Sequence, residues 1–469
     1  MNLQCPASRR AAAFGLRLSA AILALAAVAQ TAHAQIQEPR REELLNGLKI
    51  VLAQRPGDAK VLMRLRIHTG AAFDLAGKEG LTQLLADALF PDPSVAQYVR
   101  EELGGQLDVR PTYDSIDVTL GGNAAEFTRL AELLRNALLQ MRLAPEEVAR
   151  LREARLKAAR ESAQTAAAVA DRAALARLFG TYPYGRPVGG TAESLARVER
   201  VDLMLARDRF LGPNNATLVV VGNFDPARTM RVLRQFLGSW RRADSLPPAT
   251  FKQPEPAGAR ALVVDVPGAE GAEIRLVARG VARSDRDRAA AELLALVARE
   301  RWRAALAPGQ PGGVSAAHEA YALAGVLRMS ATVPATAAAE AVESARTVLR
   351  ALASAPVASA ELERARQEAR AACASSAGQF PFAAEWLDSI TYGYDAGADA
   401  RALDAVTAAD LQRVAARLVR DGQLATIVAG QASTLRGTLA NLSGGVEFPG
   451  EQHPPAPAAK SAPTVGRKP

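Results

Sequence analysis

The clearest helical pattern in the chain lies between Gly80 and Phe90. Its hydrophobic residues recur every three or four positions, and these are Leu81, Leu84, Leu85, Ala88 and Leu89. Such spacing predicts a helix with one buried face. Gln83 and Asp87 lie four residues apart and therefore share the other face, with Ala86 beside them.

The sequence around this helix alternates between strand and helix patterns. Glu42–Leu52 contains Asn46-Gly47 and is predicted to form a hairpin, Val61–Ile67 alternates as a strand does, and Asn215–Gly222 is predicted to be a buried strand. Two further strand-like pieces fall within Asp108–Gly121. Helical patterns cover about 94–103, 126–141, 145–160, 167–179, 202–210 and 226–240.

After a proline-rich stretch the same order of elements begins again. Strands are predicted at 261–266, 273–277, 326–332 and 424–430, and helices at 287–304, 337–353, 360–372 and 407–418. Gly70 and Gly222 in the first half correspond to Gly280 and Gly430 in the second half, at an offset of about 210 residues. This repeat indicates an internal duplication. The fold class expected is α+β, with helices packed on a mainly antiparallel sheet in each half.

The predicted boundaries follow from this repeat. The first domain covers 35–245, the linker 246–258, and the second domain 259–450. The remaining residues, 451–469, are rich in Pro, Ala and Lys and are expected to be disordered.

The first 34 residues have the layout of a secretory signal peptide. Arg9, Arg10 and Arg17 form a charged region, Leu18–Ala29 is apolar but too short to remain as a membrane span, and an Ala-His-Ala sequence follows. Cleavage is expected near Ala34-Gln35. The mature protein is therefore expected in the periplasm, without stable membrane insertion.

Length and charge limit the classes of function that the chain can have. At 469 residues the chain can form two sizeable domains. Its formal charge of +8 comes close to neutral once six terminal basic residues are set aside, and no basic patch is interleaved with aromatic residues. These features argue against nucleic acid as a partner. The six residues are Arg9, Arg10, Arg17, Lys460, Arg467 and Lys468.

The residues that could perform chemistry are few. The chain has four histidines, His33, His68, His318 and His453, and none shares helical spacing with another. His68 falls on a predicted strand and His318 in a predicted loop. No G-x-S-x-G, C-x-x-C, Walker-type or dinucleotide glycine pattern is present.

Gly80–Phe90 nevertheless resembles the local form G-x-x-H-x-x-E-H-x-x-F of the inverted zinc motif in the pitrilysin/insulinase-type, mitochondrial-processing-peptidase-like family of zinc metallopeptidases. Gln83 and Asp87 stand at the two His positions, and Ala86 stands at the Glu position. The resemblance extends over nearly the whole mature chain. Further matching stretches, in the family's order, are Leu45–Val51, Gly104–Asp114, Tyr184–Thr191, Asn215–Gly222 and Val264–Gly268.

The resemblance implies two layered α/β domains of about 210 residues, of the kind that often pair with a similar unit to enclose peptides. It also implies a third zinc ligand, a Glu about 75 residues after the helix, for which Glu161 is the nearest acidic residue. Zinc needs three protein ligands and a water activated by a base. Gln83 is a poor ligand and Ala86 cannot accept a proton, so no cofactor is expected. Zinc is expected only if Asp87 and Glu161 form an atypical metal site.

The same resemblance implies an Arg and a Tyr in the second domain that hold the substrate. The corresponding loop, Leu306–Ser315, contains neither. Arg303 and Tyr321 flank it and are the candidates, although solvation of Arg303 and packing of Tyr321 would explain both residues without a substrate.

Three hypotheses follow. The first is a non-catalytic homologue that pairs with a zinc-bearing peptidase subunit and binds or processes peptides with it. The second is a structural subunit of the same fold, like the core subunits of respiratory assemblies. The third is an active metallopeptidase with an atypical site. The replaced positions Gln83, Ala86 and Asp87 favour the first.

Overall fold

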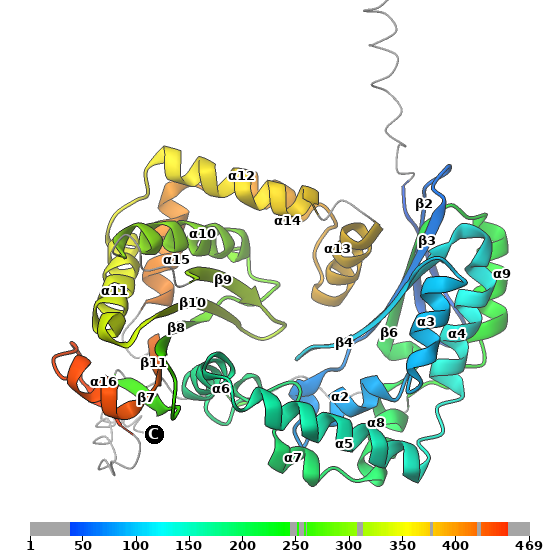
Figure 1. Ribbon diagram of the computed structural model, residues 1–469. Coiled ribbons are helices and arrows are strands. Elements are labelled where there is room, and N and C mark those ends of the chain that lie inside the picture. Colours follow the sequence, from blue (N-terminus) through cyan, green and yellow to red (C-terminus); the bar gives the residue numbers. More distant parts are fainter. Residues whose placement is uncertain are drawn as a thin grey trace, which may run out of the picture.

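The computed structural model describes residues 38–243, 251–252, 258, 260–306, 313–375, 379–419 and 424–448. The predicted signal segment, the tail and most of the predicted linker lie outside these residues. Within the described ranges, no helix combines the length and apolar character that a membrane span requires. The chain forms two halves, each built on a six-stranded sheet (Figure 1).

The first half has one mixed, mainly antiparallel sheet, as its alternating segments predict. Only β2 and β6 pair in parallel. The predicted hairpin joins β1 to β2, and Gly47 takes φ +89° in its turn, a conformation that favours glycine. In spatial order the strands are β1 (Arg40–Glu43), β2 (Lys49–Gln54), β6 (Ala216–Gly222), β3 (Lys60–Ile67), β5 (Ile116–Asn123) and β4 (Gln106–Pro111).

Apart from residues 166–179, the helices of this half bury their apolar stripes against the sheet in one continuous core. Leu84, Leu130 and Leu233 are among its fully buried members and come from three different helices. The helices are α2 (Leu81–Asp87), α3 (Pro93–Glu101), α4 (Phe127–Leu139), α5 (Pro145–Ser162), α6 (Ala166–Phe179), α7 (Ala192–Ala196), α8 (Arg200–Phe210) and α9 (Pro226–Leu237).

The second half repeats this plan. Its strands, in spatial order, are β12 (Val446–Glu447), β7 (Ala261–Asp265), β11 (Leu424–Gly430), β8 (Gly271–Gly280), β10 (Gly325–Pro334) and β9 (Ser315–Ala320). Its helices are α10 (Arg288–Ala305), α11 (Ala338–Ser354), α12 (Ser359–Ser375), α13 (Gln379–Tyr392), α14 (Ala398–Ala405), α15 (Ala408–Leu418) and α16 (Ala432–Thr438). The expectation that His318 lies in a loop is wrong, because His318 pairs with Leu327 within β9.

The two sheets match strand for strand except at one edge. The orders β2-β6-β3-β5-β4 and β7-β11-β8-β10-β9 have the same connectivity. The sixth strand precedes this unit in the first half, as β1, and follows it in the second half, as β12. Five equivalent strands in the same order support the duplication that the sequence indicates.

One helix of each half packs on the sheet of the other half, a feature that the sequence patterns do not predict. Helix α6 packs on the sheet of the second half, where Leu178 and Phe179 join a buried cluster with Val277 and Ile427. Helix α13 packs on the first sheet, with Leu387 in a cluster that also holds strand residues of β2, β3 and β6. Figure 1 shows α6 beside β11 and α13 beside β3 and β6. Each sheet is therefore covered on both faces, one of them by the opposite half.

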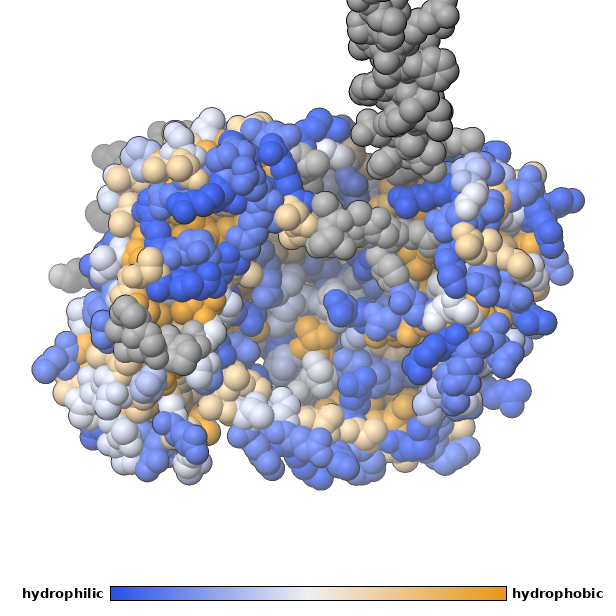
Figure 2. All heavy atoms as spheres, turned by 45° about the horizontal axis from the view of Figure 1, so that its top comes forward, coloured by the Kyte–Doolittle hydropathy of each residue, from blue (hydrophilic) through white to orange (hydrophobic). Residues whose placement is uncertain are grey.

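Buried ion pairs and hydrogen bonds also connect the two halves. The guanidinium of Arg66 on β3 contacts Asp117 on β5 at 2.7 Å and Asp388 on α13 at 2.6 Å. Asp388 also pairs with Arg283 of the second half at 3.0 Å. Asp114 accepts hydrogen bonds from the Tyr184 hydroxyl and from a backbone N–H of the second half, each at 2.7 Å. The face turned to the viewer in Figure 2 is hollowed between the two halves, with mostly hydrophilic side chains around the hollow.

Candidate functional site: a degenerate metal helix

Helix α2 begins where its sequence predicts. Gly80 takes φ +95° at the N-cap, and a Cβ there would lie 2.7 Å from Leu195 Cδ2. The buried carboxylate of Asp74 accepts hydrogen bonds from the N–H groups of Gly80 and Thr82 and from the Thr82 hydroxyl, at 2.6 to 2.9 Å. Burial raises the pKa of Asp74 to about 6, against the effect of these hydrogen bonds. The helix start is thus fixed by glycine geometry and a buried cap.

The polar face of α2 carries an ion pair. Gln83 Nε2 donates to Asp87 Oδ1 at 3.0 Å. Both carboxylate oxygens of Asp87 accept from Arg155 on α5, from Nε and from Nη2, each at 2.5 Å. These hydrogen bonds raise the pKa of Arg155. Ala86 is 1% exposed and belongs to the core, so it presents no group to this face.

The donor set does not fit zinc. A catalytic zinc needs three ligand side chains and one open position, and the Asp87 carboxylate already binds the cation of Arg155 in bidentate fashion. Among the described residues there is no group of three or more His, Cys, Asp or Glu placed to hold a metal ion.

Glu161 lies away from this pair. It follows Arg155 by six residues on α5, about 9 Å further along the helix axis. Its side chain is 65% exposed, and its ion-pair partner is Lys157 at 4.0 Å. The structure therefore brings Asp87 together with Arg155 and not with Glu161.

The second half offers an internal comparison. Helices α10 and α12, the counterparts of α2 and α5, are tied by Arg299 to Glu368 at 2.8 Å and by Arg301 to Glu361 at 2.8 Å. There the arginine belongs to the first helix and the carboxylate to the second, the reverse of Asp87 and Arg155. An arginine–carboxylate tie between these two helices is thus common to both halves.

The two substrate-holding candidates occupy different environments. Arg303 is half-exposed, pairs with Glu300 at 2.6 Å and donates to the Val314 carbonyl at 3.3 Å. Tyr321 packs edge-on against Tyr113 and Tyr184, each with ring centroids 5.1 Å away, and its hydroxyl donates to Glu319. Both residues have structural partners, and the structure does not bring them to one place with Asp87.

The sequence analysis did not identify Arg155, the residue that forms the ion pair with Asp87. It follows Asp87 by 68 residues. This separation is close to the spacing of about 75 residues at which the resemblance implies the third zinc ligand. Because the resemblance implies an acidic residue at this place, it gives no indication of an arginine there.

The two histidines of the described residues are half-buried, and neither belongs to a group of side chains placed to hold a metal ion. His68, at the end of β3, contacts the hydroxyls of Thr217 at 2.9 Å and of Thr391 on α13 at 3.3 Å. Burial, helped by the positive charges of Arg66 and Lys49, lowers its pKa to about 4. His318 accepts from the Val281 N–H at 3.1 Å, and burial lowers its pKa to about 4 as well.

His68 should make the protein sensitive to acid. Because the folded chain keeps this imidazole neutral while the unfolded chain protonates it near pH 6.5, the stability is complete above pH 6.5 and falls as the pH approaches 4. Between pH 7 and 5 we expect His68→Gln to reduce the loss of unfolding free energy by about 2 kcal/mol. Urea unfolding of both proteins at the two pH values measures this. Equal losses in the two proteins would contradict it, and the opposing titration of Asp74 cancels in the comparison.

Comparisons with known proteins find similarity to the peptidase M16 inactive domain and to proteins named as zinc proteases. The family model described as the peptidase M16 inactive domain matches residues 197–369. An uncharacterized zinc protease of Mycobacterium leprae is 26% identical over 217 residues, which are 44% of this chain and 48% of that protein. The chain thus spans about half the length of the curated relatives it matches. The family-model match begins after α2, so the evidence on the zinc positions comes from the residues themselves.

Two solved structures share the fold. A protease from Helicobacter pylori has a TM-score of 0.77 at 17% identity, over 84% of this chain and 100% of that one. A peptidase M16 inactive domain from Pseudomonas fluorescens has a TM-score of 0.76 at 17% identity, over 84% and 98%. At this identity the structural likeness concerns the fold alone. The family model and the curated relatives support the assignment of this chain as a degenerate member of the M16 peptidase family, and its residues at the H-x-x-E-H positions are Gln83, Ala86 and Asp87.

Proposed function

We propose that this chain is a non-catalytic subunit that is exported to the periplasm and pairs with a zinc-bearing homologue to bind or process peptides. The observation that carries the proposal is the bidentate contact between Asp87 and Arg155. A zinc peptidase needs a cation with an open coordination position in this place. Here the cation is a guanidinium, which has only donors and cannot activate water.

The way in which α2 is preserved supports a subunit role. The helix has a glycine start, a buried Asp74 that binds its first N–H groups, and buried leucines, while the positions that would carry the zinc ligands and the base hold Gln83, Asp87 and Ala86. A structure that keeps its scaffold and loses its reactive groups can still shape a peptide or complete a partner's chamber.

The edge strands offer a way to hold a peptide. β4 and β9 each end their sheet, so one side of each has backbone groups available to an added strand. Pro111 at the end of β4 lacks an N–H and removes one such bond. Peptide binding by backbone pairing would therefore concern the part of β4 that precedes Pro111.

Native mass spectrometry of the mature chain, purified from its own periplasm without chelator, tests this proposal. We expect a one-to-one complex with a second homologous chain and a single zinc that stays with that partner on dissociation. Zinc held by this chain itself would overturn the non-catalytic assignment. A lone, metal-free chain would overturn the pairing and favour a structural role.

A further inference from the structure

The turn between β1 and β2 carries a leucine that the described part of the molecule leaves uncovered. Leu45 is exposed at 105% of its reference area, while the large hydrophobic residue that follows it in exposure, Leu205, has 64%. The turn is tight, because the Gly47 N–H donates to the Leu44 carbonyl at 2.8 Å. Turns of this kind accept most residue types. No local preference therefore explains an apolar side chain here, and an uncovered one is typical of a surface that meets a partner or a membrane.

This turn is fixed to the end of α9. Asn46 Nδ2 donates to the carbonyls of Leu237, Gly238 and Trp240, at 2.7, 3.4 and 3.2 Å. The last carbonyls of a helix carry a partial negative charge, which repels anions. Because Asn46 binds these carbonyls, it weakens that repulsion, and it also holds Leu45 in place beside the helix end.

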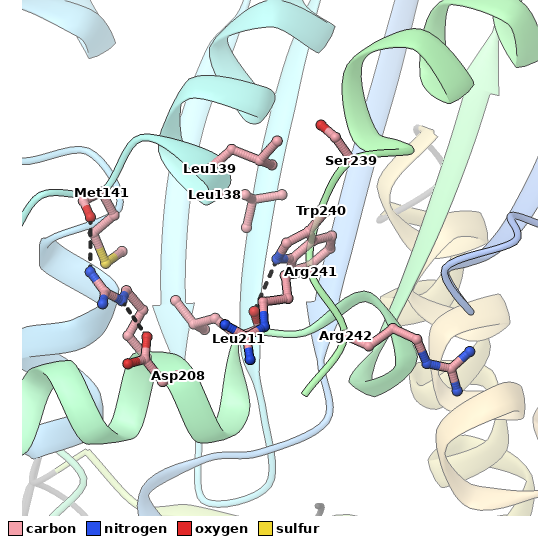
Figure 3. Close-up of a pocket in the computed structure, with 10 residues that line it drawn as sticks. Leu138, Leu139, Met141, Asp208, Leu211, Ser239, Trp240, Arg241 and Arg242 are labelled. Carbon is pink, nitrogen blue, oxygen red and sulfur yellow. Dashed lines mark hydrogen bonds and ion pairs between the residues drawn. The ribbon is translucent and has the colours of Figure 1, made fainter. Parts of the chain in front are cut away.

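Arginines lie at the same helix end. Residues 226–243, which form α9 and the segment after it, contain five arginines and no Asp, Glu or Lys. Arg234 lies in the last turn of α9. A Cβ on Gly47 would lie 3.6 Å from Arg242 Nη1, so this guanidinium is beside the turn. A close-up of the neighbouring hollow, which has a volume of about 580 Å³, shows the Arg242 side chain extending away from Trp240 (Figure 3).

Three of the five arginines are exposed and form no ion pair within the described ranges, namely Arg231, Arg234 and Arg242. Arg228 lies beside the N-cap Asp225, and Arg241 has an interaction of its own, so neither is counted. Arg231 is about 4.5 Å from Arg234 along the helix axis. This separation is shorter than the Debye length of about 10 Å at 0.1 M salt, so the charges of both residues act on the same bound surface.

Acidic side chains on the neighbouring elements do not cancel this charge. Glu43 of β1 lies opposite Lys49 of β2 in the ladder. Asp208 of α8 pairs with Arg207 at 2.8 Å. On α4, which packs beside α9, Glu132 is exposed and has no ion pair among the described residues. One unpaired carboxylate thus stands against three unpaired guanidinium groups, and the surface around the turn is positively charged.

We propose that the surface formed by Leu45, Arg231, Arg234 and Arg242, here called the hairpin-tip surface, docks the protein on a membrane of anionic phospholipids. Leu45 would enter the boundary of the acyl chains, and the guanidinium groups would bind lipid phosphates. A fluid lipid surface receives a single protruding leucine without a matching pocket, which a folded partner would have to supply. The inference goes beyond the proposed subunit role and does not depend on pairing with a zinc-bearing homologue.

Co-sedimentation of the full mature chain with lipid vesicles tests the hairpin-tip surface. One set of vesicles contains phosphatidylglycerol and phosphatidylcholine in equal amounts, and the other contains phosphatidylcholine alone. We expect at least about 10-fold tighter binding to the anionic vesicles at low salt, and a smaller difference at high salt, where the charges are screened.

A matched pair of double variants locates the charge. Arg234→Gln with Arg242→Gln should weaken binding to the anionic vesicles by at least about 10-fold. Arg350→Gln with Arg364→Gln removes the same charge at exposed positions on α11 and α12 of the second half, and we expect less than about twofold change.

A matched pair of single variants locates the apolar contact. Leu45→Ser should weaken binding by about fivefold at low and at high salt, because it removes the inserted side chain and no charge. Leu75→Ser alters another exposed leucine of the first half, at 55% exposure, and should change binding by less than about twofold. Both positions are exposed, so urea unfolding should show that each variant stays as stable as the parent protein.

Every other outcome overturns the inference. Equal losses in the two double variants would show adsorption by net charge alone, and an unchanged affinity for Leu45→Ser would show that the turn does not enter the membrane. Equal binding to the two kinds of vesicle, or no binding to either, would exclude anionic lipid as the partner. In each of these cases the proposed pairing stands or falls separately, by native mass spectrometry.

Discussion

Gln83→His and Asp87→His together with Arg155→Glu should create a zinc site that the two histidine substitutions alone do not create. The helix already presents positions 83 and 87 on one half-exposed face, and Arg155 already faces position 87. The triple variant would supply three zinc ligands. With Arg155 retained, a fixed positive charge stands where the third ligand is needed and repels the metal.

Competition with a chromophoric chelator measures the result. We expect the triple variant to bind one zinc at least about 100-fold more tightly than the double variant, a difference of about 2.8 kcal/mol. The double variant with Arg155→Gln is the matched control, because it removes the charge without adding a ligand, and it should fall between the two. Equal zinc affinity with Arg155 present and replaced would show that Arg155 does not occupy the metal position.

Arg66→Met should lower the free energy of unfolding by about 3 kcal/mol, because it removes the main partner of a buried carboxylate. The Arg66 guanidinium binds Asp117 through two hydrogen bonds, at 2.7 and 2.8 Å, and reaches Asp388 of α13 at 2.6 Å. Asp117 is 4% exposed, and in the variant its carboxylate would keep only the longer contact to Arg64, at 3.2 Å, so most of its desolvation would be left uncompensated. The contact to Asp388 also ties the exchanged helix α13 to the first sheet, so both halves should respond.

Urea unfolding followed by tryptophan fluorescence and by circular dichroism measures this loss. Arg66→Met with Asp117→Leu should recover part of it, since the uncompensated charge is then removed. Arg129→Met is the control: its side chain is 61% exposed, its partner Glu126 is 3.3 Å away, and we expect a change within about 0.5 kcal/mol. A loss for Arg66→Met no larger than that of the control would show that the buried network does not hold the halves together.

Local patterns predicted most of the elements. The hairpin around Asn46-Gly47, the helix after Gly80 and the strand at Ala216–Gly222 all occur as expected, because turn glycines and side-chain periodicity act within a few residues. Helix α13 was not predicted, although the duplication offers a signal, since α6 stands at the equivalent place in the first half. β9 was also missed, and His318 with it, because its alternation is weak: Ala316 is buried, but its neighbours are small or polar.

Part of the candidate site, likewise, can be predicted from the sequence, and part of it cannot. That the zinc ligands and the base are replaced can be read directly from Gln83, Ala86 and Asp87, since their spacing on a helix follows from the sequence. That Arg155 neutralises Asp87 cannot be read in this manner. The two residues are 68 positions apart, and their contact depends on how α5 crosses α2.

The duplication, the helical frame of Gly80–Phe90 and the replacement of the H-x-x-E-H residues were determined by the amino-acid sequence alone, because each depends on residue type and short-range spacing. The exchange of α6 and α13 between the halves, the pairing of Asp87 with Arg155 across 68 positions and the pairing of Arg66 with Asp388 across 322 positions were established by folding. These features join residues far apart in the chain, and the packing of whole sheets and helices sets such distances, whereas no local preference does.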